Sequence, residues 1–335
     1  MNIIKLIKKP GQGKIDFFAT VDGETVDDAI DYAIEAICAQ TGVYGNDDGD
    51  AEPALRDRLG DRQFDMLLQH HVMSRIMPFV IKEQADLNMA FEPQCSGEEI
   101  PHRGENFTFQ IHVLQRPTCI LSSYDPVEVT VARYIVTDDA VDKRIAQLGA
   151  ENPDYAEAAG DPEVADVMRE QVRADLEREA EHQSNQDLNV VVDAMLAHRL
   201  QGKIPNELYE SAANSVYANL LSTLRQQGST LEQFAAAQGL DQNQVRMQVA
   251  MQAQSIVMQG LALDKLFDMK VGQLTDEDIE AAYTSFSPGH EDEVKKQFEE
   301  SGRIYAVHEV AKRMAAHKWL LANAKITYKD EDYQI

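Results

Sequence analysis

The sequence predicts an α+β N-terminal domain, residues 1–150, followed by an elongated all-α multi-armed domain, residues 151–335. The principal observation lies in residues 161–227, where apolar side chains recur at intervals of three, four and seven from Val164 to Leu200. This spacing places one apolar stripe on a helix. At ~1.5 Å per residue the helix spans on the order of 60 Å, which is longer than a compact domain is wide. The second observation is that the strand-like segments lie almost entirely before residue 137.

The N-terminal part alternates between strand and helix patterns. β-Branched and aromatic residues predict strands at 14–21 (KIDFFATV), 107–114 (FTFQIHVL) and 127–136 (VEVTVARYIV). A helix is expected over residues 26–40, with Thr25 as its cap ahead of an acidic first turn. Two helices follow between residues 55 and 79, with a kink or break at Pro78, and another begins after the cap residue Thr137.

The long helix has a polar middle and a defined end. Residues 181–187 are entirely polar, so a helix there has no apolar face to bury, and we expect it to cross solvent between two packed regions. Gly202 ends the helix and Pro205 starts a return helix, because proline loses no hydrogen bond in a first helical turn. Residues 149–162, with two glycines, two prolines and no periodicity, mark the domain boundary.

The remainder of the chain predicts further helices and one extended end. Capping boxes are expected at Ser229–Glu232 and Thr275–Asp278. Residues 242–270 form a strong helical pattern, and one or two more helices follow the Ser287–Gly289 turn. Residues 324–328 (AKITY) look extended and close the chain.

Composition excludes several function classes. The net charge of −26 argues against nucleic-acid binding, which needs clustered Lys and Arg. No apolar run approaches the ~20 residues of a membrane span, and the N-terminus has no signal-peptide pattern, so we expect a cytoplasmic protein without membrane contact. The three cysteines, Cys38, Cys95 and Cys119, are widely spaced, which favours reduced, half-buried thiols.

The ionisable residues form no pattern typical of an enzyme. His70 and His71 are adjacent, so they point to different sides of a helix. Glu179 and His182 have the spacing of a metal-ligand pair, but the sequence offers no co-ligands near them, so we interpret both as solvated. The same interpretation applies to the remaining candidates, His308, Glu309 and His317. We therefore expect no catalytic residue, no metal site and no cofactor.

The order of these segments resembles one protein family. Residues 173–216 combine a charged long helix with a proline restart and an acidic-capped return helix (RADLEREAEHQSNQDLNVVVDAML, then KIPNELYESAANSV). Residues 105–117 (ENFTFQIHVLQRP) add a closing strand and residues 322–328 (ANAKITY) a helix-to-strand exit. From Lys14 to about Tyr333 this layout is similar to that of bacterial trigger factors. The resemblance implies a ribosome-binding-type N-terminal domain and a helical, chaperone-type C-terminal domain.

The sequence departs from the family in two places. Trigger factors usually carry a prolyl isomerase domain of the FKBP type, and its only possible position here, residues 149–162, is too short. The family docks on the ribosome through a loop of the form Gly-Phe-Arg-x-Gly-Lys-x-Pro. The equivalent here is degenerate (Gly42, Val43, Tyr44, Gly45), and residues 15–55 hold eleven Asp or Glu and no Lys or Arg. Ribosomal RNA would repel that surface, so we expect no ribosome docking.

The principal hypothesis for function is an ATP-independent chaperone, a holdase that binds unfolded or nascent polypeptides in a helical cradle. Candidate client-binding residues are Met247, Met251, Met258, Tyr209 and Tyr217. The three methionines share a helix face, and their flexible side chains fit many partners. The favoured interpretation of the methionines is nevertheless that they pack in the core against the return helix.

The alternative hypothesis is a dedicated acidic assembly or scaffold protein for one basic partner. Its high negative charge would attract a basic protein and speed association, with binding that weakens as salt rises. A homodimer formed through the N-terminal part is a further possibility that the residues leave open.

Overall fold

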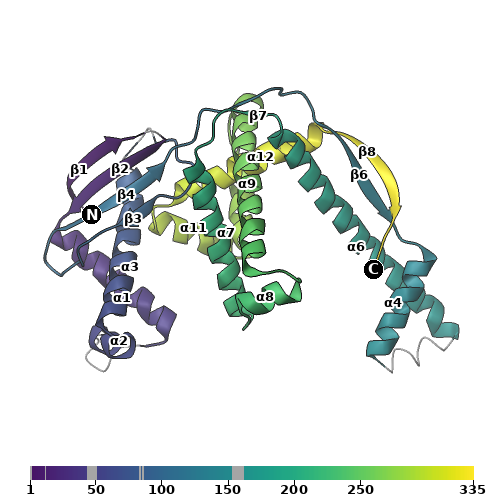
Figure 1. The fold of residues 1–335 in the computed structure, drawn as a ribbon, viewed down its shortest axis with the longest axis horizontal. Helices are drawn as coiled ribbons and strands as arrows, with labels where there is room; N and C mark the ends of the chain where they lie inside the picture. The colour runs from purple at the N-terminus through teal and green to yellow at the C-terminus, as the bar shows by residue number, and fades with distance from the viewer. Residues whose placement is uncertain (1, 12, 44–50, 83, 85–86, 153–161) are drawn as a thin grey trace. The chain divides into compact units, whose positions relative to one another are not determined.

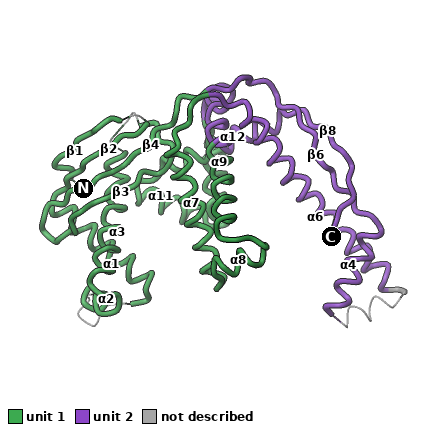
Figure 2. Tube along the Cα trace, in the orientation of Figure 1, with its two compact units in different colours: residues 1–119, 202–257, 274–312 green, residues 120–201, 258–273, 313–335 purple. Residues whose placement is uncertain are grey.

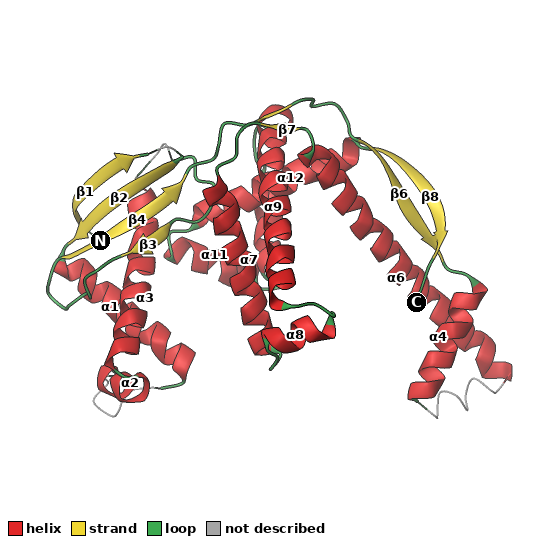
Figure 3. Ribbon diagram, in the orientation of Figure 1, coloured by secondary structure: helices red, strands yellow, loops and turns green. Residues whose placement is uncertain are grey.

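The computed structural model describes residues 2–11, 13–43, 51–82, 84, 87–152 and 162–335. Helices predominate, and strands occur in the first 135 residues, after the long helix and at the C-terminus (Figure 3). The chain forms two compact units (Figure 2). Unit 1 comprises residues 1–119, 202–257 and 274–312, and unit 2 comprises residues 120–201, 258–273 and 313–335. Each unit combines segments far apart in the sequence.

Unit 1 begins with a four-stranded antiparallel sheet (Figure 1). Its strands are β1 (Ile3–Pro10), β2 (Lys14–Val21), β3 (Gln94–Ser96) and β4 (Phe107–Leu114), in the order β1-β2-β4-β3. Its helices are α1 (Gly23–Thr41), α2 (Glu52–Leu59) and α3 (Asp61–Lys82). Alternate residues of β2 and β4 are buried, and with α1 and α3 they form one core that includes Phe17, Phe64, Phe107 and Phe109. This α+β arrangement confirms the fold class predicted for the N-terminal region.

In this region two local predictions need correction, and one strand was missed. The cap of α1 is Asp22, whose carboxylate accepts from the N–H of Thr25, whereas the Thr25 hydroxyl is buried and accepts from the N–H of Asn2. Pro78 lies inside α3 without ending it. Strand β1 was not predicted, because its Lys-rich sequence lacks a clear alternation, and it forms by pairing with β2.

The rest of unit 1 is helical. It contains α7 (Asn206–Gln226), α8 (Leu231–Ala237), α10 (Asp276–Phe286) and α11 (Glu291–Glu300). The helices α9 (Gln242–Leu266) and α12 (Ile304–Asn323) run through the division between the units. The capping box at Thr275–Asp278 is confirmed, but the box of α8 uses Thr230 and Gln233, one residue beyond the predicted pair.

Unit 2 is built around the long helix α6 (Pro162–Ala197), which confirms the predicted element. Its end lies at Ala197 and not at Gly202 as predicted, and Leu200–Gln201 form a short strand before that glycine. Its other elements are β5 (Ile120–Leu121), β6 (Glu128–Ile135), α4 (Asp138–Glu151), β7 (Leu200–Gln201), the π-helical turn η1 (Phe267–Val271) and β8 (Lys325–Asp332). β5 pairs with β7, and β6 pairs in parallel with β8. α4 packs on α6 through a small core of Ala140, Val141, Val172 and Leu176.

The polar middle of α6 is not the bare solvent crossing that its sequence predicts. Most of residues 181–187 are exposed, but Ser184 is buried. Its hydroxyl accepts a hydrogen bond of 3.1 Å from the N–H of Tyr134 in β6, and the Tyr134 hydroxyl donates to Asp187 at 2.7 Å. The small, hydrogen-bonding side chain of Ser184 therefore lets a strand lie along the helix, which an apolar pattern does not reveal.

The division of the chain at residue 150 stays a prediction, because both units are discontinuous and the predicted boundary segment lies largely outside the described residues. Among the helices that the structure describes, none combines the length and hydropathy required to cross a bilayer.

Candidate functional site

Helix α9 presents two opposite stripes in unit 1. One stripe is buried and consists of residues four apart, namely Val245, Val249, Ala253 and Val257. The other holds Met247 and Met251, which are 60% and 57% exposed. The prediction that these two methionines pack in the core is therefore wrong. Both stripes have helical spacing, and the valines, not the methionines, face the interior.

The third methionine of the predicted face lies in a different setting. Met258 belongs to unit 2 and is half-buried. From Leu261 onward α9 is buried on several sides, with Leu261, Ala262, Leu263 and Leu266 all in the interior. The predicted core role thus fits Met258 in part, and the exposed large apolar side chains of α9 are those of Met247, Met251 and Ile256.

The two candidate tyrosines lie apart on α7. Tyr217 is half-buried, and the guanidinium of Arg246 lies over its ring at 6.0 Å from the centroid, which places Tyr217 beside the residue that precedes Met247. Tyr209 is half-buried, and burial, with the neighbouring Cys119, raises the pKa of its phenol. Tyr217 therefore lies against Arg246 of α9, whereas Tyr209 is a packing residue at the start of α7.

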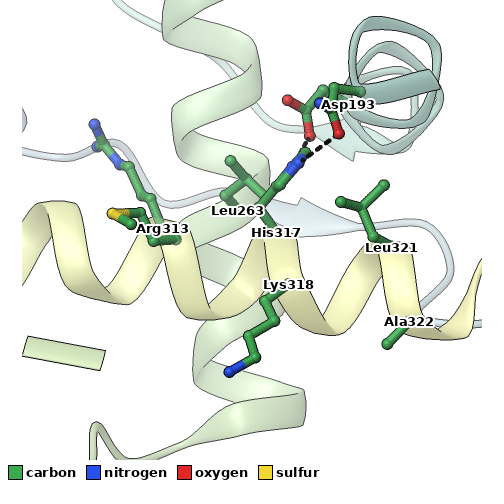
Figure 4. Close-up of a pocket in the computed structure, with 9 residues that line it drawn as sticks. Asp193, Leu263, Arg313, His317, Lys318, Leu321 and Ala322 are labelled. Atoms are coloured by element: carbon green, nitrogen blue, oxygen red, sulfur yellow. Dashed lines mark hydrogen bonds and ion pairs between the residues drawn. The ribbon is translucent and has the colours of Figure 1, made fainter. Parts of the chain in front are cut away.

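Unit 2 contains a groove of ≈ 800 Å³ between α6, α9 and α12 (Figure 4). Apolar side chains of α9 and α12 form much of its lining: Leu263, Met314, Leu321 and Ala322. Asn189 and Asp193 from α6 face His317 of α12, whose Nδ1 lies 2.8 Å from Asp193 Oδ1 and whose Nε2 lies 3.2 Å from Asn189 Oδ1. Both nitrogens of the imidazole are engaged, so the solvated role predicted for His317 is wrong.

An ion pair with a buried carboxylate and a half-buried guanidinium fixes one wall of this groove. The Arg313 guanidinium donates two hydrogen bonds to Asp264, Nε to Oδ1 at 2.9 Å and Nη2 to Oδ2 at 3.0 Å, and Asp264 is only 6% exposed. Residues of α12 four apart, Arg313 and His317, thus each hold a carboxylate on another helix. In the sequence, the sign of this groove is that two polar residues, Arg313 and His317, lie four apart among apolar residues of one helix. Their partners, Asp264 and Asp193, are distant in the sequence, so the spacing does not identify them.

The ionisable groups elsewhere are engaged in structural contacts. Glu179 pairs with Arg144 at 2.7 Å, and His182 lies 2.8 Å from Gln186, so the spacing of Glu179 and His182 does not make a ligand pair. Glu309 contacts Arg116 and Lys312 in place of the predicted solvated position. Burial raises the pKa of Cys95 to about 12. In the described parts of the chain, no cluster of His, Cys, Asp and Glu has the composition of a metal site.

The degenerate loop is described only at its beginning. Gly42 ends α1 with φ 68°, in the left-handed region, and Val43 packs against the core of the sheet domain. Tyr44 and Gly45 lie outside the described residues. Within the described residues, two cations from other segments lie on the acidic helix α1: Arg103 pairs with Asp31 at 2.6 Å, and the Arg75 guanidinium lies 4.7 Å from the ring centroid of Tyr32.

Comparisons with known proteins agree with this order of elements. The family model described as "Bacterial trigger factor protein (TF)" matches residues 4–148, and the model "Bacterial trigger factor protein (TF) C-terminus" matches residues 165–322. Trigger factors of Acetivibrio thermocellus and Pelobacter propionicus are 25% and 22% identical over 189 and 201 residues, or 55% and 59% of this chain. The matches cover 44% and 45% of those two proteins. The chain thus spans less than half the length of these relatives.

A solved structure from work on promiscuous substrate recognition by the trigger factor chaperone aligns with 94% of this chain and all of its own, at 10% identity and a TM-score of 0.37. The family models, in contrast, match consecutive segments that together cover most of the sequence, in the order that the family has. The chain therefore belongs to the bacterial trigger factor family.

Proposed function

We propose that this protein is an ATP-independent chaperone that holds unfolded or nascent polypeptides on its helical arms. The observation that carries the proposal is the exposure of Met247 and Met251 on a helix whose opposite stripe is buried. Large apolar side chains that stay exposed in a row are available for contact with other chains. Family membership points the same way, since the C-terminal family model covers this helix.

The chemistry of these side chains suits varied clients. Methionine is unbranched and polarizable, so it adapts to partners of different shape. Tyr217 on α7, with the guanidinium of Arg246 over its ring, is a further aromatic candidate for client contact. Binding by dispersed apolar contacts depends little on salt, because screening acts on charges.

The test is aggregation suppression by the full chain with a chemically denatured, unrelated protein. The double variant Met247→Ser, Met251→Ser is expected to lose most of the suppression while its circular dichroism spectrum stays unchanged. The control is Met66→Ser, since Met66 is 64% exposed on α3, outside the arms. Equal suppression by the wild type and the double variant would show that the methionines are not the client-binding residues.

A second candidate function is a dedicated scaffold for one basic partner, and the net charge of −26 favours it. The two functions differ in how the binding affinity depends on salt concentration. A scaffold binds one protein, and its affinity falls as salt rises. A holdase binds many unrelated chains with little dependence on salt, so proteins cross-linked to it in cells distinguish the two.

Several features of the proposal rest on the sequence. We place the chaperone in the cytoplasm, without an isomerase domain between residues 148 and 165, and divide it near residue 150. The acidic first helix and the degenerate loop at Gly42 support a chaperone that does not dock on ribosomes. Co-sedimentation with ribosomes at physiological salt would contradict that last part.

A further inference from the structure

Strand β8 forms the outer edge of a two-stranded parallel sheet. Among the described residues its one partner strand is β6 (Figure 3). The register places Val129 opposite Ile326 and Val131 opposite Tyr328. Apart from the half-buried Ile326, every residue of β8 is exposed. A strand in this position presents one row of backbone groups to its neighbour and the other row outward.

The hydrogen bonds fix which residues face outward. The Lys325 N–H donates to the Val127 carbonyl at 2.8 Å, and the Tyr333 N–H donates to the Ile135 carbonyl at 2.9 Å. Backbone direction alternates along a strand, so odd-numbered residues of β8 bond to β6 and even-numbered residues point away. The same alternation holds in β6, where the N–H of the even-numbered Tyr134 points away from β8 and donates to Ser184 on α6.

The outward row of β8 is open. Within the described residues, no group accepts from the backbone N–H of Ile326, Tyr328 or Asp330. The Tyr328 side chain is 48% exposed, on the same face as the buried Val131. The open row thus passes two apolar side chains, Ile326 and Tyr328, in the first half of the strand.

We propose that this edge binds an extended, basic polypeptide segment by strand addition, next to β8. The inference rests on the proposed chaperone function, since the occupant is an unfolded client. Main-chain hydrogen bonds are formed by any extended sequence, so they suit a protein that binds many clients. Unfolded chains offer such segments, whereas folded proteins keep theirs paired.

The negative charge of β8 favours a basic segment. β8 ends in three acidic residues, Asp330, Glu331 and Asp332, within a chain of net charge −26. Asp330 already holds Arg133 at 2.6 Å, and a residue of the added strand would lie beside it on the same face. The segment that fits this edge has an apolar residue beside Tyr328. It has a Lys or Arg beside Asp330 or Asp332. Acidic segments would be repelled.

The binding experiment uses the full chain and a short fluorescent peptide of alternating Val and Thr that ends in lysines. The control peptide has the same side chains with methylated backbone nitrogens on one edge, and it is expected not to bind. Tyr328→Pro removes an outward N–H and leaves the bonds to β6 in place, whereas Tyr328→Ala removes only the side chain. We expect Tyr328→Pro to bind about 5-fold more weakly than Tyr328→Ala, the effect of one net hydrogen bond.

Amide hydrogen exchange followed by NMR gives a signature that is independent of the variants. Adding the peptide should slow exchange at Ile326, Tyr328 and Asp330 and leave Thr327 and Lys329 unchanged, because those two already bond to β6. Equal binding of the methylated peptide, or no alternation in exchange, would overturn the inference. Protection of the even-numbered amides without peptide, rising with protein concentration, would mean that a second copy occupies the edge. Loss of peptide binding with normal aggregation suppression leaves the proposed chaperone function intact.

Discussion

Replacing Arg313 by Met should destabilise unit 2 by about 3 kcal/mol. Removing one member of a buried ion pair costs about 3–5 kcal/mol, because the remaining charge is left in the interior. Asp264 is 6% exposed, but the Arg313 side chain is 35% exposed and reached by water, which selects the low end of that range. The variant Asp264→Leu, Arg313→Met removes both charges, and we expect its stability to lie within about 1 kcal/mol of the wild type or above it.

Urea unfolding followed by tryptophan fluorescence measures this effect. The single tryptophan, Trp319, lies on α12 in unit 2, with the Lys270 ammonium 5.6 Å from its ring centroid. The signal therefore reports on the unit that contains the ion pair. A loss below about 1 kcal/mol for Arg313→Met would refute the reasoning, as would a double variant that loses as much as the two single variants together.

Gly260 offers an internal check on the same pair. A Cβ at Gly260 would lie 3.2–3.4 Å from three guanidinium atoms of Arg313. Alanine favours a helix over glycine by about 1 kcal/mol. In the wild type we expect Gly260→Ala to gain nothing, because two hydrogen bonds to Asp264 hold the guanidinium in place. In the Arg313→Met background the gain should return, and a stabilised Gly260→Ala in both backgrounds would contradict the geometry.

The remaining predictions concern three other positions. Burial lowers the pKa of His71, so protonation of this residue favours unfolding. The stability that it contributes above pH 6.5 is lost as the pH falls through and below that value. His71→Gln should therefore weaken the pH dependence of stability in urea titrations between about pH 7.5 and about pH 5. Gly202 has φ 141° and its Cβ would lie 2.9 Å from the Thr118 carbonyl oxygen, so Gly202→Ala should cost about 1–3 kcal/mol in urea unfolding. Leu176→Ala, in the core between α4 and α6, should cost about 2–5 kcal/mol, whereas the exposed Val167→Ala should stay within about 0.5 kcal/mol.

The local elements follow closely from the sequence. Apolar spacing predicted α6, and the motif at Thr275–Asp278 predicted the start of α10, because helix periodicity and capping involve residues only a few positions apart. The same holds for β2 and β4, whose alternation reflects one buried face. These are short-range properties, which a sequence displays directly.

The tertiary structure decided what lies against each surface. Two stripes of α9 have helical spacing, and only packing shows that the valines are buried while Met247 and Met251 are exposed. The partners of Arg313 and His317 lie on α9 and α6, and β8 finds β6 almost two hundred residues earlier in the chain. The spacing of apolar residues shows which side chains share a helix face. Which face is buried, and which strand pairs with which, depend on distant segments that no local pattern identifies. The family could therefore be inferred from the order of elements, whereas the exposed methionines, the groove and the open strand edge required the fold.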